Sequence, residues 1–242
     1  MENISGHIIH VFLHFVVGAS LAYLFCGKAA ASKVNRKVLF IFGGAAAISP
    51  DISKLYGDLL GHSIWLVPVI GLFFAACYYA FQREISFKKA WLILSICVFS
   101  HLFIDFIGNG VAPFYPFIKT ESDFFIVNRN DTVLLITLTT ALIIGASTRR
   151  RRRIFLSGLI LVALYLGGLS FSKLQLQHAL EKKYKNENIY VMLTFPREGF
   201  KWSFMVRTDE TSVDGYSPIA GLDIHIEQEM NKSGEWINVD KQ

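Results

Sequence analysis

Long apolar runs fill the first 172 residues and constrain the fold more than any other feature of this sequence. They end near Phe171, after which the chain becomes polar. Because about 20 apolar residues are enough for a helix to cross a bilayer, we expect a polytopic helical bundle in the membrane. About six spans are predicted, at residues 7–26, 36–50, 62–81, 89–108, 132–147 and 154–172.

The composition agrees with a membrane protein and argues against an ordinary soluble domain. Hydrophobic residues make up 52% of the chain, and the mean hydropathy is +0.41. Cys26, Cys77 and Cys97 all lie within apolar runs, so we expect neither a disulfide framework nor a cysteine-type zinc site. The first run lacks the basic start and small-residue cleavage site of a signal peptide, which favours a retained first span.

The polar part of the chain predicts a small second domain. Its first residues, SKLQLQHALEKKYKN, are typical of a helical stalk. Asn188–Pro196, Phe200–Thr208 and Leu222–Glu229 then alternate apolar and polar residues, the pattern of half-buried strands. The predicted fold is therefore mainly α: a membrane bundle in residues 1–173, followed by a stalk and a small antiparallel β domain in residues 174–242.

Basic residues are distributed unevenly among the predicted loops. The loops after the first, third and fifth spans hold Lys28, Lys33, Arg36, Lys37, Arg83, Lys88, Lys89 and Arg149–Arg153. The loops after the second and fourth spans hold only Lys54, Lys119 and Arg129. The positive-inside rule makes the first set cytoplasmic, so we expect an inner-membrane protein whose N-terminus and C-terminal domain are extracytoplasmic. We interpret Arg149–Arg153 as a topology anchor and expect no nucleic-acid partner.

Histidine and aspartate side chains gather at the predicted outer ends of four spans. They are His14, Asp51, His62, His101 and Asp105. A polar side chain in hydrocarbon is costly and marks a functional site by default. Nitrogen and oxygen ligands of this kind suit zinc. The sequence therefore predicts a site for a divalent metal ion, with zinc the first choice, at the outer face of the bundle.

The individual signals differ in strength. His101 and Asp105 are four residues apart on one helix face, and apolar residues separate them, which favours a metal pair over a structural hydrogen bond. Taken alone, Asp51 is more simply an interfacial charge, whereas His62 is equally consistent with a helix-start residue and with a ligand. His10, four residues before His14, is a reserve ligand.

This ligand set predicts metal-assisted hydrolysis near the outer membrane interface. A bound zinc ion activates water and polarises a phosphoryl or carbonyl oxygen. Since catalytic zinc usually has three protein ligands, one carboxylate is spare. Asp51 or Asp105 is then the expected general base or orienting residue. The expected partner is membrane lipid, and the expected substrate is a lipid ester, a phosphodiester or another amphiphile.

Residues 7–120 resemble the YdjM-like family of membrane-bound, metal-dependent hydrolases, also described as LexA-binding inner-membrane proteins. The resemblance rests on His14-x-x-x-Gly18, Pro50-Asp51, His62-Ser63 and His101-x-x-x-Asp105, followed by Gly110 and Pro116-Phe117. The sequence departs from that pattern in having Ser53 where a second Asp is usual, and Tyr56-Gly57-Asp58 in place of a His-Arg segment.

The order of the ligands is also similar to that of zinc-dependent phospholipase C enzymes. The later His and Glu ligands of those enzymes are not evident after Asp105. This similarity therefore implies one metal site and not a cluster.

Two other functions compete with the hydrolase. One is a non-enzymatic scaffold or metal-binding protein whose extracytoplasmic domain binds a protein partner. A carrier should have polar residues through the full membrane depth, and the last two predicted spans offer little beyond Thr and Ser. The other is an intramembrane protease using Ser63 or Ser100, which is disfavoured because the chain has no G-x-S-x-G motif. Substrate, oligomeric state and protein partner stay open.

Overall fold

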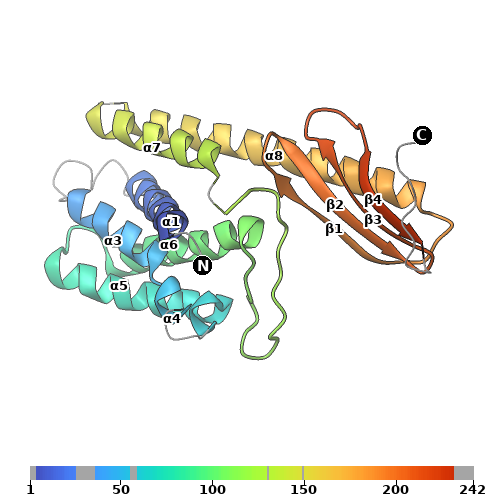
Figure 1. Ribbon diagram of the computed structural model, residues 1–242. Helices are drawn as coiled ribbons and strands as arrows, with labels where there is room; N and C mark the ends of the chain where they lie inside the picture. The colour runs from blue at the N-terminus through green and yellow to red at the C-terminus, as the bar shows by residue number, and fades with distance from the viewer. Residues whose placement is uncertain (1–3, 26–35, 55–58, 130, 149, 232–242) are drawn as a thin grey trace. The chain divides into compact units, whose positions relative to one another are not determined.

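The computed structural model describes residues 4–25, 36–54, 59–129, 131–148 and 150–231 (Figure 1). The described chain forms two compact units, each treated separately below. The first comprises residues up to Phe124 together with Arg129–Val162, and the second comprises Phe125–Asn128 and the chain from Ala163 onwards. Cys26, Lys28, Lys33, Arg149 and the segment Tyr56-Gly57-Asp58 lie outside the described residues.

The first unit is entirely helical apart from its connecting segments. Its elements are α1 (Ile4–Phe25), α3 (Arg36–Ile48), α4 (Asp51–Lys54), the 3-10 turns η1 (Leu60–His62) and η2 (Ile64–Leu66), α5 (Val67–Phe81), α6 (Phe87–Gly108), α7 (Thr132–Ser147) and the first part of α8 (Arg151–Lys183). Helices therefore occupy all six predicted positions.

Four helices of the described chain are long and apolar enough to cross a membrane. They are Gly6–Phe25, Ile64–Phe81, Phe87–Gly108 and Arg152–Lys183. Lys37–Ile48 and Thr132–Gly145 are apolar but shorter. The mainly helical membrane fold is thus confirmed, whereas the count of six spans is not.

Small residues allow α1 and α3 to pack closely. A Cβ atom on Gly18 would lie 2.4 Å from the carbonyl oxygen of Gly43 and 2.4 Å from the Cβ of Ala47. A Cβ atom on Gly43 would lie 2.4 Å from the Cβ of Ala22. Glycine and alanine four residues apart on each helix are typical of close helix contacts in membranes. Helix α6 packs against both α1 and α3.

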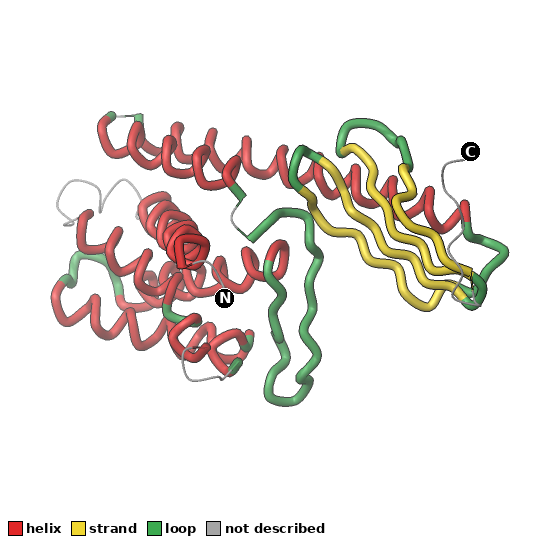
Figure 2. The backbone as a smooth tube through the Cα atoms, in the orientation of Figure 1, coloured by secondary structure: helices red, strands yellow, loops and turns green. Residues whose placement is uncertain are grey.

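The second unit is a four-stranded antiparallel sheet with the later part of α8. The strands β1 (Ile189–Arg197), β2 (Lys201–Thr208), β3 (Thr211–Pro218) and β4 (His225–Asn231) pair in chain order (Figure 2).

Alternate residues of β2 are buried, and Trp202 donates a hydrogen bond of 2.9 Å to the hydroxyl of Ser172 on α8. Gln177, also on α8, donates one of 3.0 Å to Thr194. The sheet therefore covers one face of the helix that the sequence predicted as a stalk.

Three of the four strands lie where the sequence predicts them, and β3 does not appear in the prediction. Its sequence, TSVDGYSP, contains residues that favour turns. Pairing on both edges holds it extended, and Gly215 is needed there because a Cβ atom would lie 2.2 Å from the carbonyl oxygen of His225. The predicted division at residue 173 lies within the continuous helix α8, and the assignment of domains stays a prediction.

Candidate metal centre

The structure brings all five predicted residues together at one end of the helical unit, and it adds His10. These six side chains come from α1 (His10, His14), α4 (Asp51), η1 (His62) and α6 (His101, Asp105). The four histidines and Asp105 are fully buried, and Asp51 retains 14% side-chain exposure. Their roles as ligands and catalytic groups stay predictions, but the convergence itself is a feature of the fold.

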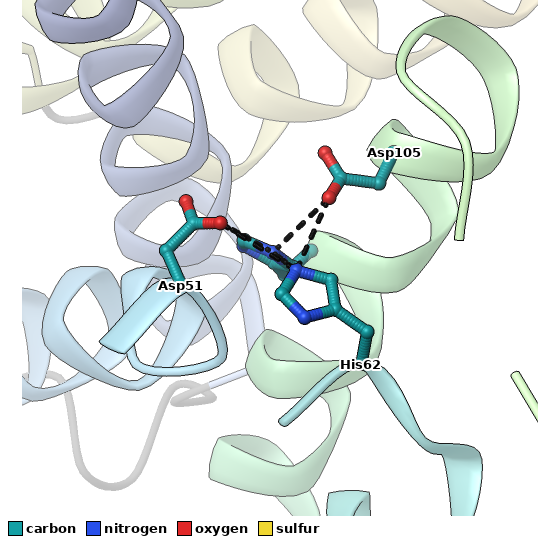
Figure 3. Close-up of side chains that lie close together, drawn as sticks. Asp51, His62 and Asp105 are labelled. Atoms are coloured by element: carbon teal, nitrogen blue, oxygen red, sulfur yellow. Dashed lines mark hydrogen bonds and ion pairs between the residues drawn. The ribbon is translucent and has the colours of Figure 1, made fainter. Parts of the chain in front are cut away.

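The first group of ligand atoms consists of two carboxylate oxygens and two imidazole nitrogens. Oδ1 of Asp51 lies 3.5 Å from Nε2 of His62 and 3.6 Å from Nε2 of His101. Oδ2 of Asp105 lies 3.3 Å from Nε2 of His62 (Figure 3). It lies 3.4 Å from Nε2 of His101, and the two nitrogens are 3.0 Å apart. Tetrahedral zinc bonds of about 2.0–2.2 Å separate ligand atoms by about 3.3–3.6 Å. The four residues therefore fit a single divalent ion.

A second group lies around the other oxygen of Asp105. Oδ1 of this carboxylate is 3.1 Å from Nε2 of His10 and 3.3 Å from Nε2 of His14, and these nitrogens are 3.0 Å apart. Nδ1 of His10 donates a hydrogen bond of 3.0 Å to the carbonyl oxygen of Arg129. His10 therefore belongs to the site as fully as His14 does, although the sequence marks it only by its spacing from His14.

Ser53 and Gly61 bring His62 to Asp51. The hydroxyl of Ser53 donates to the carbonyl oxygen of Pro50 at 3.0 Å and accepts from the backbone N–H of Gly61 at 3.1 Å. A Cβ atom on Gly61 would lie 2.5 Å from that carbonyl oxygen, so only glycine fits. At the position where the resemblance expects a second aspartate, Ser53 thus joins two turns of the chain.

Packing orients most of the histidine rings. The His14 ring stacks on the His101 ring with 4.0 Å between centroids, and the His62 ring meets the His101 ring edge-on at 5.0 Å. Among the described residues, Nδ1 of His14, His62 and His101 has no hydrogen-bond partner. Of the four histidines in the site, His10 alone has its Nδ1 held by a backbone carbonyl, that of Arg129. This arrangement is common in metal-binding histidines.

Lys54 is a charged member of the site that sequence reasoning treated only as a loop residue. Its Nζ lies 3.0 Å from Oδ2 of Asp105 and 3.6 Å from Oδ1 of Asp51. The only sequence signal is its position three residues after Asp51, on the same short helix. Lys54 therefore supplies positive charge to the two carboxylates in the structure.

Neighbouring charges shift the pKa values of Asp51 and His62, two members of the site that lie outside the four long apolar helices. Burial alone would raise the pKa of Asp51, but the hydrogen bond to His62 and the positive charge nearby hold this pKa below its ordinary value. Burial alone would lower the pKa of His62, yet its contacts with Asp105 and Asp51 raise it above the usual value. The carboxylates thus create a field that favours cations.

A cavity of about 360 Å³ opens beside the site. Asp51 and His62 line it, together with Lys54, Arg129 and Glu121. This volume is at the lower end of the range of small-molecule pockets, about 300–1,000 Å³. Asp51 and His62 are therefore the members of the His and Asp cluster that a bound molecule reaches first.

Comparison with known proteins identifies the family. A search of curated proteins and a search of solved structures found no match to this chain. The family model described as YdjM inner membrane protein matches residues 9–176, which include His10, His14, Asp51, His62, His101 and Asp105. The chain therefore belongs to the YdjM inner membrane protein family.

Proposed function

We propose that the chain is a membrane-embedded, metal-dependent hydrolase that acts on a lipid ester or phosphodiester near the outer membrane interface. The observation that carries this proposal is the set of four ligand atoms, spaced as around one tetrahedral ion and adjoining an open cavity. A divalent ion held there would polarise a phosphoryl or carbonyl oxygen and lower the pKa of a water to about 7.

Asp51 is the better candidate for the general base. It lines the cavity, and its Oδ2 has no hydrogen-bond partner among the described residues, while its Oδ1 faces His62 and His101. Asp105 is fully buried, and both of its oxygens already face imidazole nitrogens. In this proposal His62, His101 and Asp105 would hold the ion, as the three protein ligands usual for catalytic zinc, and Asp51 would accept a proton from the attacking water.

Two basic side chains in the cavity lining support an anionic substrate group such as a phosphate. Lys54 and Arg129 both line the cavity and supply donors for oxygen anions. Glu121 and Asp51, also in the lining, have the opposite charge. A phosphodiester would place its charged oxygens toward the two basic side chains and its reacting phosphorus toward Asp51 and His62.

The segment beside the cavity supports access from lipid. Residues Asn109–Ala112 line the cavity, and the same segment exposes Phe114, Phe117 and Ile118. Trp65, itself 57% exposed, lies edge-on to Phe117 with 6.5 Å between ring centroids. Exposed aromatic residues of this kind collect at membrane interfaces, where a lipid headgroup would reach the cavity.

Turnover by the purified protein tests the proposal. Vesicles containing a fluorogenic phospholipid phosphodiester, and separately a carboxylic ester lipid, are incubated with the full chain and a divalent metal. We expect release of product by the wild type and its loss in His101→Ala and Asp105→Ala. His178→Ala serves as the control, because His178 is 83% exposed and remote in sequence from the cluster.

The same assay addresses the competing functions. Ser63→Ala should keep its turnover, since an enzyme of this type needs no serine nucleophile. Lack of turnover with both lipids and all metals would favour the non-enzymatic scaffold or metal-binding protein. In that case a deletion of the chain from Tyr190 onwards should give the same cellular phenotype as loss of the whole protein. The His101→Ala variant should behave in cells like the wild type.

A further inference from the structure

We infer that the buried cluster is a dinuclear centre in which the carboxylate of Asp105 bridges two divalent ions. The first ion would be held by His62, His101 and Oδ2 of Asp105, with the proposed general base Asp51 beside it. The second would be held by His10, His14 and Oδ1 of Asp105. This inference rests on the proposed metal site and replaces the sequence expectation of a single ion.

The two oxygens of Asp105 face different histidine pairs. Oδ2 lies 3.3 and 3.4 Å from Nε2 of His62 and His101, whereas Oδ1 lies 3.1 and 3.3 Å from Nε2 of His10 and His14. Within each pair the two Nε2 atoms are 3.0 Å apart. The carboxylate of Asp105 therefore faces two similar pairs of imidazole nitrogens, one pair at each oxygen. A single ion bound at one pair would leave the other pair, and the other oxygen, without a metal.

The protons on His10 indicate what belongs in the second set. A carbonyl oxygen only accepts, so Nδ1 of His10 carries the proton in its 3.0 Å bond to the carbonyl of Arg129. In the neutral ring, Nε2 then presents a lone pair to Oδ1 of Asp105 at 3.1 Å. Two lone pairs at this distance repel each other unless a proton or a metal ion lies between them.

His14 cannot relieve this conflict completely. Its Nε2 lies 3.0 Å from Nε2 of His10 and 3.3 Å from Oδ1 of Asp105, so a single N–H would have to serve two acceptors. Its Nδ1 has no hydrogen-bond partner within the described part of the chain. A metal ion in contact with all three atoms satisfies their lone pairs at once.

The position of Asp51 fits a two-ion arrangement as well. A carboxylate oxygen of Asp51 lies within 4.8 Å of the ligand nitrogens of His10 and His14, in addition to its place in the first set. Paired catalytic ions are typically about 3.5–4 Å apart, a spacing that a shared carboxylate supports. Both ions would then adjoin the residue proposed as the general base.

Metal content of the full-length protein tests this inference directly. The protein is purified in detergent, loaded with Zn²⁺, freed of excess metal by gel filtration and analysed by mass spectrometry. We expect about two ions per chain in the wild type and in His178→Ala, and about one in His10→Ala and in His14→Ala. The elution profile of each variant shows whether the fold is kept.

A second measurement detects the pair of ions in the wild-type protein itself. After loading with Mn²⁺, two ions bridged by Asp105 should give the exchange-coupled electron paramagnetic resonance signal of a pair. His10→Ala should give only the signal of isolated Mn²⁺. One ion per chain in the wild type, with an uncoupled signal, would overturn the dinuclear centre but leave the first site intact. No bound ion at all would overturn the proposed function as well.

Discussion

The ammonium nitrogen of Lys54 lies 3.0 Å from Oδ2 of Asp105, the same oxygen that faces His62 and His101. Lys54 therefore supplies positive charge beside the position proposed for a metal ion. Its side chain is 32% exposed and lines the cavity, so it has room to turn toward solvent when an ion binds. Lysine and metal thus compete for the same carboxylates.

Replacing this lysine should strengthen metal binding. Two unit charges about 4 Å apart near a protein surface interact by about 4 kcal/mol, and a divalent ion would be repelled more strongly. Because the lysine can move away, we expect a smaller gain, with the zinc dissociation constant of Lys54→Met falling about tenfold. Competition with a chromogenic chelator measures it, and Lys119→Met, on an exposed residue, is the control. Weaker binding by Lys54→Met would show that the lysine supports the site.

Gly61→Ala should weaken metal binding without removing any ligand. The new Cβ would lie 2.5 Å from both the carbonyl oxygen of Pro50 and the hydroxyl of Ser53, and the strain would move His62 away from Asp51. Changes that misplace a ligand through its supporting residues typically cost about 10–100-fold in metal affinity. Gly167→Ala is the matched control, because a Cβ there meets nothing within 4 Å. Equal zinc affinity in the two variants would contradict the positioning role of Gly61.

The sequence locates most of the cluster because its members are isolated in apolar surroundings. His101 and Asp105 stand out among Leu, Phe and Ile on one helix. Antiparallel spans bring the end of one helix beside the start of the next, so Asp51 and His62 had to meet near that same end. Spacing along single helices and the alternation of spans were therefore sufficient to predict the convergence.

Other features depend on contacts between segments that a single sequence does not reveal. His10 joins the site through the carbonyl of Arg129, which lies 119 positions away in the chain. Lys54 belongs to the site because its Nζ lies beside Oδ2 of Asp105, a residue of another helix. Strand β3 is held extended by its neighbours in spite of turn-forming residues.

Close packing of α1 on α3 should contribute measurably to stability. Gly18→Ala places a Cβ 2.4 Å from the carbonyl oxygen of Gly43, and forced overpacking typically costs about 1–3 kcal/mol. We expect a lower midpoint of thermal unfolding in detergent for Gly18→Ala than for Gly168→Ala, a helical position with open space around it. A Gly18→Ala midpoint equal to or above that of the control would mean that the two helices tolerate a wider separation.

The orientation of the chain in the membrane is a further proposal from the distribution of Lys and Arg. In a background without native cysteines, Gln228→Cys on β4 should react with an impermeant maleimide in cells with a permeabilised outer membrane. Arg83→Cys, in the loop between α5 and α6, should react only after lysis. The opposite labelling pattern would place the His and Asp cluster at the cytoplasmic side.

The central claim is that the buried His and Asp cluster binds divalent metal, and Asp105 is the ligand common to both proposed ions. The most direct test is the metal content of the purified wild-type protein, Asp105→Ala and His178→Ala after loading with Zn²⁺ and removal of the excess. We predict retained zinc in the wild type and in His178→Ala, and loss of the zinc in Asp105→Ala. A wild-type protein without zinc, or an Asp105→Ala protein with as much zinc as the wild type, would contradict the account.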